Sequence, residues 1–263
     1  MTGMKATTMK AKNSVWMILS IAGGAYFCSV PPVQAATCYY EPYFLSSDLR
    51  AIDQYFVSRI CEQSIVDRYW QTFGFRKKYW DDGFGYEDVC NWQKPLGRTM
   101  GALYLLDNSY SPKASSLGDW SGPGVKWAYP YSGTVYDGLD DLRQKCFNGS
   151  WWAYTRWGPF TDDRIEYYWP LTYRVHTIQR AAVVLHEGHH YGIKKDHSCN
   201  SSQDRNWSDW RPYASETYYL ISYYWSANRH TSSTWRTWAA DRADARIASK
   251  FCNPPPDWVR NFR

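Results

Sequence analysis

Three residues close together in the chain, His186, Glu187 and His190, have the types and spacing of a metal-dependent active site. Residues four apart lie on one face of an α-helix, so His186 and His190 can direct two imidazoles to one tetrahedral zinc ion. Glu187 then lies beside the ion without binding it, where a carboxylate can take a proton from water and pass it to a leaving group. The pattern predicts a Zn²⁺ site with Glu187 as the general base.

The segment 175–200 resembles the zincin metallopeptidases, whose active-site helix carries the same H-E-x-x-H pattern, here His186-Glu187-Gly188-His189-His190. The resemblance extends over about a tenth of the chain. It implies zinc at the two outer histidines, Glu187 as general base, and a peptide or protein as substrate. The expected activity is that of a zinc metallopeptidase, a hydrolase that uses zinc-activated water.

The metzincin branch of these enzymes does not fit. Its extended pattern places a glycine and a third histidine where this chain has Ile193 and Asp196. Metzincins also carry a methionine turn after the motif, whereas the only methionine after the predicted signal peptide, Met100, precedes it.

The third metal ligand therefore has three candidates. His197 lies on the loop that leaves the helix, close to Cys199, whose disulfide would fix that loop. Glu216 is the only glutamate after the motif and corresponds to the gluzincin pattern, in which the third ligand is a glutamate on a following helix. Imidazole is the commonest zinc ligand, and Gly192 permits the chain reversal that His197 requires. We rank His197 first, Glu216 second and Asp196 third.

The start of the chain predicts export. Residues 1–35 have the features of a secretory signal peptide: lysines at the start, an apolar run and small residues before the expected cleavage site. We therefore expect a secreted or periplasmic protein with a single domain at 36–263 and no membrane association after the signal is removed. Removing the signal leaves six cysteines, an even number that predicts up to three disulfide bonds in an oxidising compartment: Cys38, Cys61, Cys90, Cys146, Cys199 and Cys252.

Composition excludes several classes of protein. Removal of Lys5, Lys10 and Lys12 with the signal lowers the formal net charge from +5 to +2, which gives no electrostatic basis for binding nucleic acid. Aromatic residues make up 19% of the chain, and this is not the composition of a coiled coil or simple helical bundle. We interpret most of the aromatic residues as core and expect a few to line a cleft.

Periodicity predicts an α+β fold. We expect a zincin-like domain in which the active-site helix packs on a small aromatic-rich sheet, with further helices towards the C-terminus. The expected elements are a surface helix at 47–73, short strands and loops at 74–138, strands at 150–157 and 164–169, the active-site helix at 172–191, a helix from Pro212, and a helix at 235–251.

Two other interpretations compete with an enzyme. The histidines could form a polar, solvent-facing helix surface without metal. Alternatively, the protein could be a non-catalytic secreted module in which zinc is structural and exposed aromatic residues bind glycans or proteins. A closed site with four protein ligands would favour the second interpretation, and three ligands beside an open cleft would favour an enzyme.

Overall fold

A computed structural model describes most of the predicted domain. The described residues are 47–81, 83–108, 141–145, 152–156, 163–173, 175–193, 196–209, 211–226 and 232–263. The predicted signal peptide, Cys38, Cys146 and the whole of the region 109–138 lie outside them. No described helix is long and apolar enough to cross a membrane.

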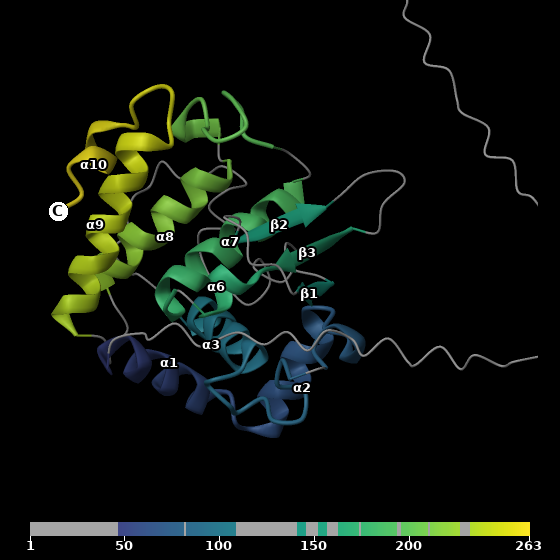
Figure 1. The fold of residues 1–263 in the computed structure, drawn as a ribbon. Coiled ribbons are helices and arrows are strands. Elements are labelled where there is room, and N and C mark those ends of the chain that lie inside the picture. The colour runs from purple at the N-terminus through teal and green to yellow at the C-terminus, as the bar shows by residue number, and fades with distance from the viewer. Residues whose placement is uncertain are drawn as a thin grey trace, which may run out of the picture. The chain divides into compact units, whose positions relative to one another are not determined.

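The described residues form an α+β fold, which confirms the predicted class. The described elements are eight α-helices and a small mixed sheet, which lies at one side of the helices (Figure 1). The helices are α1 (Ser47–Arg59), α2 (Gln63–Thr72), α3 (Pro95–Asn108), α6 (Trp169–Tyr173), α7 (Thr177–Ile193), α8 (Pro212–Ser226), α9 (Ser233–Ser249) and α10 (Asp257–Arg260). The helices expected from Pro212 and over 235–251 are thus present as α8 and α9.

The sheet has three strands in the order β1-β3-β2, with β1 (Leu142–Gln144), β2 (Ala153–Arg156) and β3 (Arg164–Tyr167). Strand β3 is parallel to β1 and antiparallel to β2. Three residues of β3 are buried, namely Ile165, Glu166 and Tyr167. Strand β2 lies at the edge of this described sheet. Most of the buried aromatic side chains lie on helices and loops, and Tyr167 is the one that belongs to a described strand.

Helix α7, which carries the histidine motif, is the centre of the fold. It packs against β2 and β3 on the sheet side and lies between α3 and α8, while α9 covers α8 (Figure 1). Every residue from 181 to 190 is buried. A helix that is covered on all sides is a core helix, so the interpretation of the histidines as a solvent-facing surface is wrong.

The active-site helix predicted at 172–191 begins at Thr177, and two other expected elements differ more from the structure. The helix predicted over 47–73 is two helices, because the chain turns at Ile60–Glu62, where Cys61 is bonded to Cys90. The apolar spacing continues across the break since both helices pack on the same core.

The region predicted as strands and loops contains helix α3. Gly97 and Gly101 both lie inside this helix at points of close packing. A Cβ atom on Gly97 would come within 2.5 Å of the Asn91 carbonyl oxygen, and one on Gly101 within 3.3 Å of Val57. Glycine here permits close approach of neighbouring chain rather than a turn.

A buried ionic network fixes the start of α7. The Asp53 carboxylate on α1 accepts a hydrogen bond of 2.9 Å from the Thr177 backbone N–H, and it lies 3.7 Å from Arg98 and 3.6 Å from Arg180. The Arg180 guanidinium also donates to the carbonyl oxygens of Leu171, Arg98, Thr172 and Val175. Asp53 and Arg180 are fully buried, so the carboxylate offsets two buried cations and caps the helix that carries the histidines.

Replacing Asp53 with alanine should therefore destabilise the protein strongly. Removing one partner from a buried ionic network leaves uncompensated charge and costs about 3–5 kcal/mol. Urea denaturation measures this change in the free energy of unfolding, and Asp81→Ala is the matched control, because its pairing with Lys77 is solvent-exposed and worth at most about 0.5 kcal/mol. Equal losses in the two variants would contradict the structural role of Asp53.

Candidate metal centre

Three histidines, two on helix α7 and one on the loop that follows it, form a group that could hold a metal ion. One nitrogen from each of His186, His190 and His197 lies within 4.8 Å of the others. Their ring centroids are separated by 4.9–5.3 Å. His186 and His190 are 8% and 9% exposed, as expected for ligands on one face of a buried helix.

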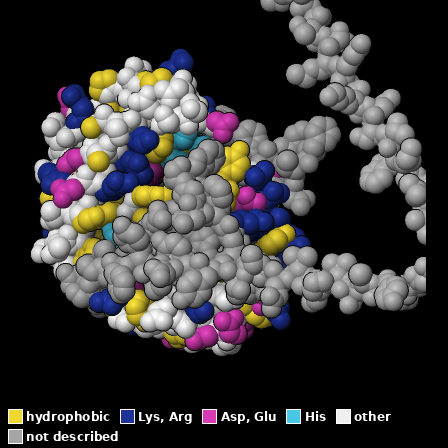
Figure 2. Space-filling model, viewed as in Figure 1, with side chains coloured by type: hydrophobic (Ala, Val, Ile, Leu, Met, Phe, Trp, Pro, Cys, Tyr) yellow, Lys and Arg dark blue, Asp and Glu magenta, His cyan; other side chains and the backbone are white. Residues whose placement is uncertain are grey.

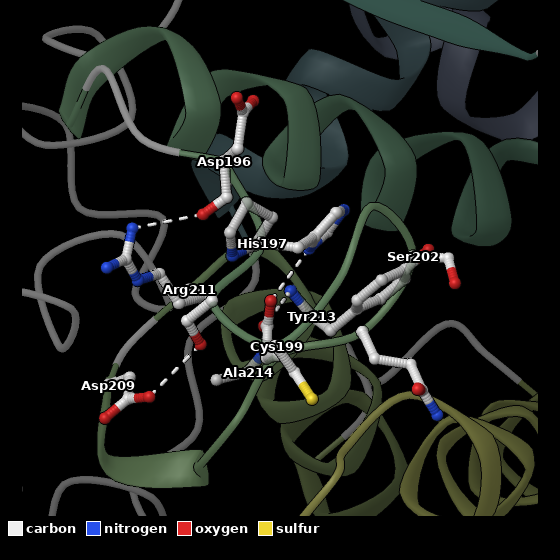
Figure 3. A network of polar contacts seen from close by, with 12 residues as sticks. Asp196, His197, Cys199, Ser202, Asp209, Arg211, Tyr213 and Ala214 are labelled. Carbon is white, nitrogen blue, oxygen red and sulfur yellow. Dashed lines mark hydrogen bonds and ion pairs between the residues drawn. The ribbon is translucent and has the colours of Figure 1, made fainter. Parts of the chain in front are cut away.

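The loop that supplies His197 is held at several points. Its Nδ1 atom lies 2.7 Å from Oδ1 of Asp204, whose second oxygen accepts hydrogen bonds from the backbone N–H groups of Tyr213 and Ala214 at the start of α8. The His197 ring also stacks on Tyr213, with centroids 4.5 Å apart (Figure 3).

The same loop is tied to the C-terminal part of the chain. A disulfide joins Cys199 to Cys252, and the Asp204 backbone pairs with residues 250 and 252. The sequence predicted a disulfide at Cys199 but left its partner open. Arg211 donates to the Asp196 carbonyl oxygen, 3.0 Å away (Figure 3). These contacts give the loop a fixed position although it contains little regular secondary structure.

Glu216 lies behind His186. Its Oε2 atom is 3.1 Å from Nδ1 of His186, and its Oε1 atom accepts from Arg246 on α9 at 2.7–2.8 Å. Burial acts to raise the pKa of Glu216, but the Arg246 charge and the His186 hydrogen bond lower it to about 2. For His186 the pKa falls to about 3 because burial outweighs the attraction of Glu216. The pair is thus a carboxylate and a neutral imidazole, the form of histidine that binds metals.

Glu187 is buried against the sheet. The Thr155 hydroxyl on β2 lies 2.8 Å from Oε2 of Glu187 and 2.9 Å from its backbone carbonyl oxygen. Burial raises the pKa of this carboxyl to about 7, although the hydrogen bonds from Thr155 act in the opposite direction. Glu187 therefore has a fixed orientation beside the histidine group.

A cleft of about 250 Å³ opens next to these residues. Its walls come from α7, α8, α9 and the start of β2, and its lining consists of Trp152, Ala153, Val183, His186, Glu187, Tyr213, Glu216, Arg242 and Arg246. In Figure 2, arginine and lysine side chains lie close to the visible histidine surface. The sequence-based expectation that a few aromatic residues line a cleft holds for Trp152 and Tyr213.

The donor set fits zinc. Tetrahedral zinc with Zn–N bonds near 2.05 Å holds its nitrogens ~3.4 Å apart, so small ring rotations would close the group around one ion. With Nδ1 of His186 and of His197 each facing a carboxylate, Nε2 is the nitrogen available to the ion in both rings. Carboxylates in these positions orient histidine ligands in zinc sites and fix their tautomer.

The predicted site residues thus take different positions. His197 joins His186 and His190 in the three-histidine group. Glu216 instead contacts Nδ1 of His186, and Asp196 is exposed. Sequence analysis missed Asp204 and Thr155, because nothing in their sequence spacing connects them to the motif.

Comparisons with protein-family models, with curated proteins and with solved structures gave no match.

Zinc analysis of three variants tests the ligand set. The parent should bind one zinc per chain, and His186→Ala and His197→Ala should each lose it, because each removes a ligand nitrogen. Glu216→Gln should retain zinc with about 10–100-fold lower affinity, since it removes only the partner of a ligand. Competition with a fluorescent chelator measures the affinities.

His176→Phe serves as the control and should bind zinc like the parent. His176 precedes α7 and packs against Trp238, with ring centroids 4.0 Å apart, outside the three-histidine group. Full zinc retention in His197→Ala together with loss in Glu216→Gln would instead assign the third position to Glu216.

Proposed function

We propose that this protein is a zinc-dependent hydrolase that cleaves peptide bonds outside the cytoplasm. The proposal rests on one observation: the same cleft is lined by His186, a candidate metal ligand, and by Glu187, a candidate proton carrier. A structural zinc site needs no cleft and no additional carboxylate. This combination therefore favours catalysis over a purely structural role.

Zinc held by His186, His190 and His197 would supply a Lewis acid and lower the pKa of a water molecule in the cleft. Glu187 would take the proton from the attacking water and give it to the amine that leaves. The hydrogen bond from Thr155 would hold one oxygen of this carboxylate and leave the other available for proton transfer. Glu187 is only 8% exposed, and this would limit proton exchange between its carboxylate and bulk water.

Strand β2 supports a peptide as the substrate. It lies at the edge of the described sheet and contains Thr155. Its first residue, Ala153, and the preceding Trp152 line the cleft. An extended peptide can add to a sheet edge through backbone hydrogen bonds. A peptide aligned with β2 would pass beside Glu187, with its side chains alternating between the cleft and solvent.

Location outside the cytoplasm is supported by the cysteines. Cys61–Cys90 and Cys199–Cys252 form disulfides, and such bonds persist in oxidising compartments. The second of these bonds holds the loop that carries His197, so an oxidising environment would also preserve the candidate metal centre.

Glu187→Gln tests the proposal. The variant should keep its zinc and fold but hydrolyse peptides about 10²–10⁴-fold more slowly, because glutamine has nearly the same shape and cannot accept the proton. A library of internally quenched peptides identifies a cleaved sequence with the parent, and turnover of that peptide is then compared across variants. Glu87→Gln, an exposed position far from the motif in sequence, is the control and should match the parent.

Turnover in Glu187→Gln equal to that of the parent would contradict the proposed role of Glu187. Zinc binding together with glycan binding that survives chelation, and no cleaved peptide, would favour the non-catalytic module instead.

A further inference from the structure

The cleft has a basic wall that the proposed chemistry does not use. Arg242 and Arg246 lie one helical turn apart on α9, and both line the cleft together with His186 and Glu187. Residues four apart on a helix have Cβ atoms about 6 Å from each other. The two guanidinium groups therefore belong to one side of the cleft, next to the candidate metal centre.

The two arginines differ in their partners. Arg246 forms an ion pair with Glu216, which also contacts His186, so its charge is offset inside the protein. Among the described residues, no salt bridge includes Arg242, and its buried Nε atom has no hydrogen-bond partner. Its guanidinium lies 5.8 Å from the centre of the Trp152 ring, which also lines the cleft.

An unpaired donor of this kind needs an explanation. Buried polar atoms in proteins almost always have a partner, and exceptions often mark a functional site. Burial and the neighbouring Arg246 lower the pKa of Arg242, and the charges of Glu216 and Tyr213 oppose this only in part. An anion that contacts the guanidinium group from the cleft would compensate this charge.

We propose that Arg242 binds a carboxylate of the substrate, so that the cleft selects peptides with an acidic group close to the scissile bond. This inference rests on the proposed peptidase function and specifies its substrate class. Arginine matches a carboxylate through two parallel N–H···O hydrogen bonds. Arg242 lies one turn of α9 from Arg246, which is linked through Glu216 to His186. The distance between the two arginines along the helix corresponds to about two residues of extended peptide.

The carboxylate has two possible sources in a peptide. It can be the α-carboxylate of the C-terminus, which would make the protein an exopeptidase, or the side chain of aspartate or glutamate, which would make it an endopeptidase with acidic specificity. Both present the same planar anion to Arg242. Probes that differ only in the position of that anion separate the two.

Three dipeptide hydroxamates serve as probes, because a hydroxamate binds zinc directly and needs no turnover. The first ends in a neutral amide, the second in a free α-carboxylate, and the third has a glutamate side chain and an amidated end. Affinities are measured by calorimetry on the zinc-loaded parent, on Arg242→Gln and on Arg236→Gln. Arg236 is an exposed arginine on the same helix and does not line the cleft.

The parent and Arg236→Gln should bind at least one of the two anionic probes about tenfold or more tightly than the neutral probe. In Arg242→Gln this preference should fall to about twofold or less, while affinity for the neutral probe stays the same. Arg242→Lys keeps the charge without the planar fork and should give an intermediate preference, which provides a second test should the glutamine variant fold poorly.

The outcomes separate the two proposals. A parent that binds all three probes equally, or an Arg242→Gln variant that retains the full preference, contradicts the carboxylate site alone. A zinc-loaded parent that binds no hydroxamate contradicts the proposed function and, with it, the carboxylate site.

Discussion

Two hydrogen bonds between a carboxylate and an imidazole determine the arrangement of the candidate metal centre. Glu216 faces Nδ1 of His186, and Asp204 faces Nδ1 of His197. Each contact fixes the rotation of a ring and leaves its other nitrogen directed away from the carboxylate. Without these two hydrogen bonds, the rings of His186 and His197 could rotate, and the nitrogens of the three imidazoles would not be directed to a common point.

Each carboxylate is in turn held by another part of the fold. Asp204 caps the start of α8 and joins the Cys199–Cys252 segment, whereas Glu216 is paired with Arg246 from α9. The loop, α8 and α9 therefore act together on residues contributed by α7. The C-terminal helices α8 and α9 lie directly behind the histidines. In this position the two helices supply the charges that buried ligands require.

The sequence was sufficient for the part of the site that depends on helical spacing. The i, i+4 relation of His186 and His190 and the proximity of His197 to Cys199 could be recognised without a structure. The positions of Asp204, Thr155 and Arg242 beside the site could not, because each residue reaches it through tertiary packing from a different element. Helix α3 was missed for a related reason, because its glycines, Gly97 and Gly101, are explained by close packing with other segments of the chain.

The central claim is that His186, His190 and His197 bind one zinc ion while Glu216 and Asp204 stay outside its ligand shell. The most direct test is a crystal structure of the zinc-loaded protein with an anomalous difference map recorded at the zinc absorption edge. The account predicts one strong peak about 2.1 Å from a nitrogen of each of these three rings. A peak bound by the Glu216 carboxylate in place of His197, or located away from α7, would contradict it.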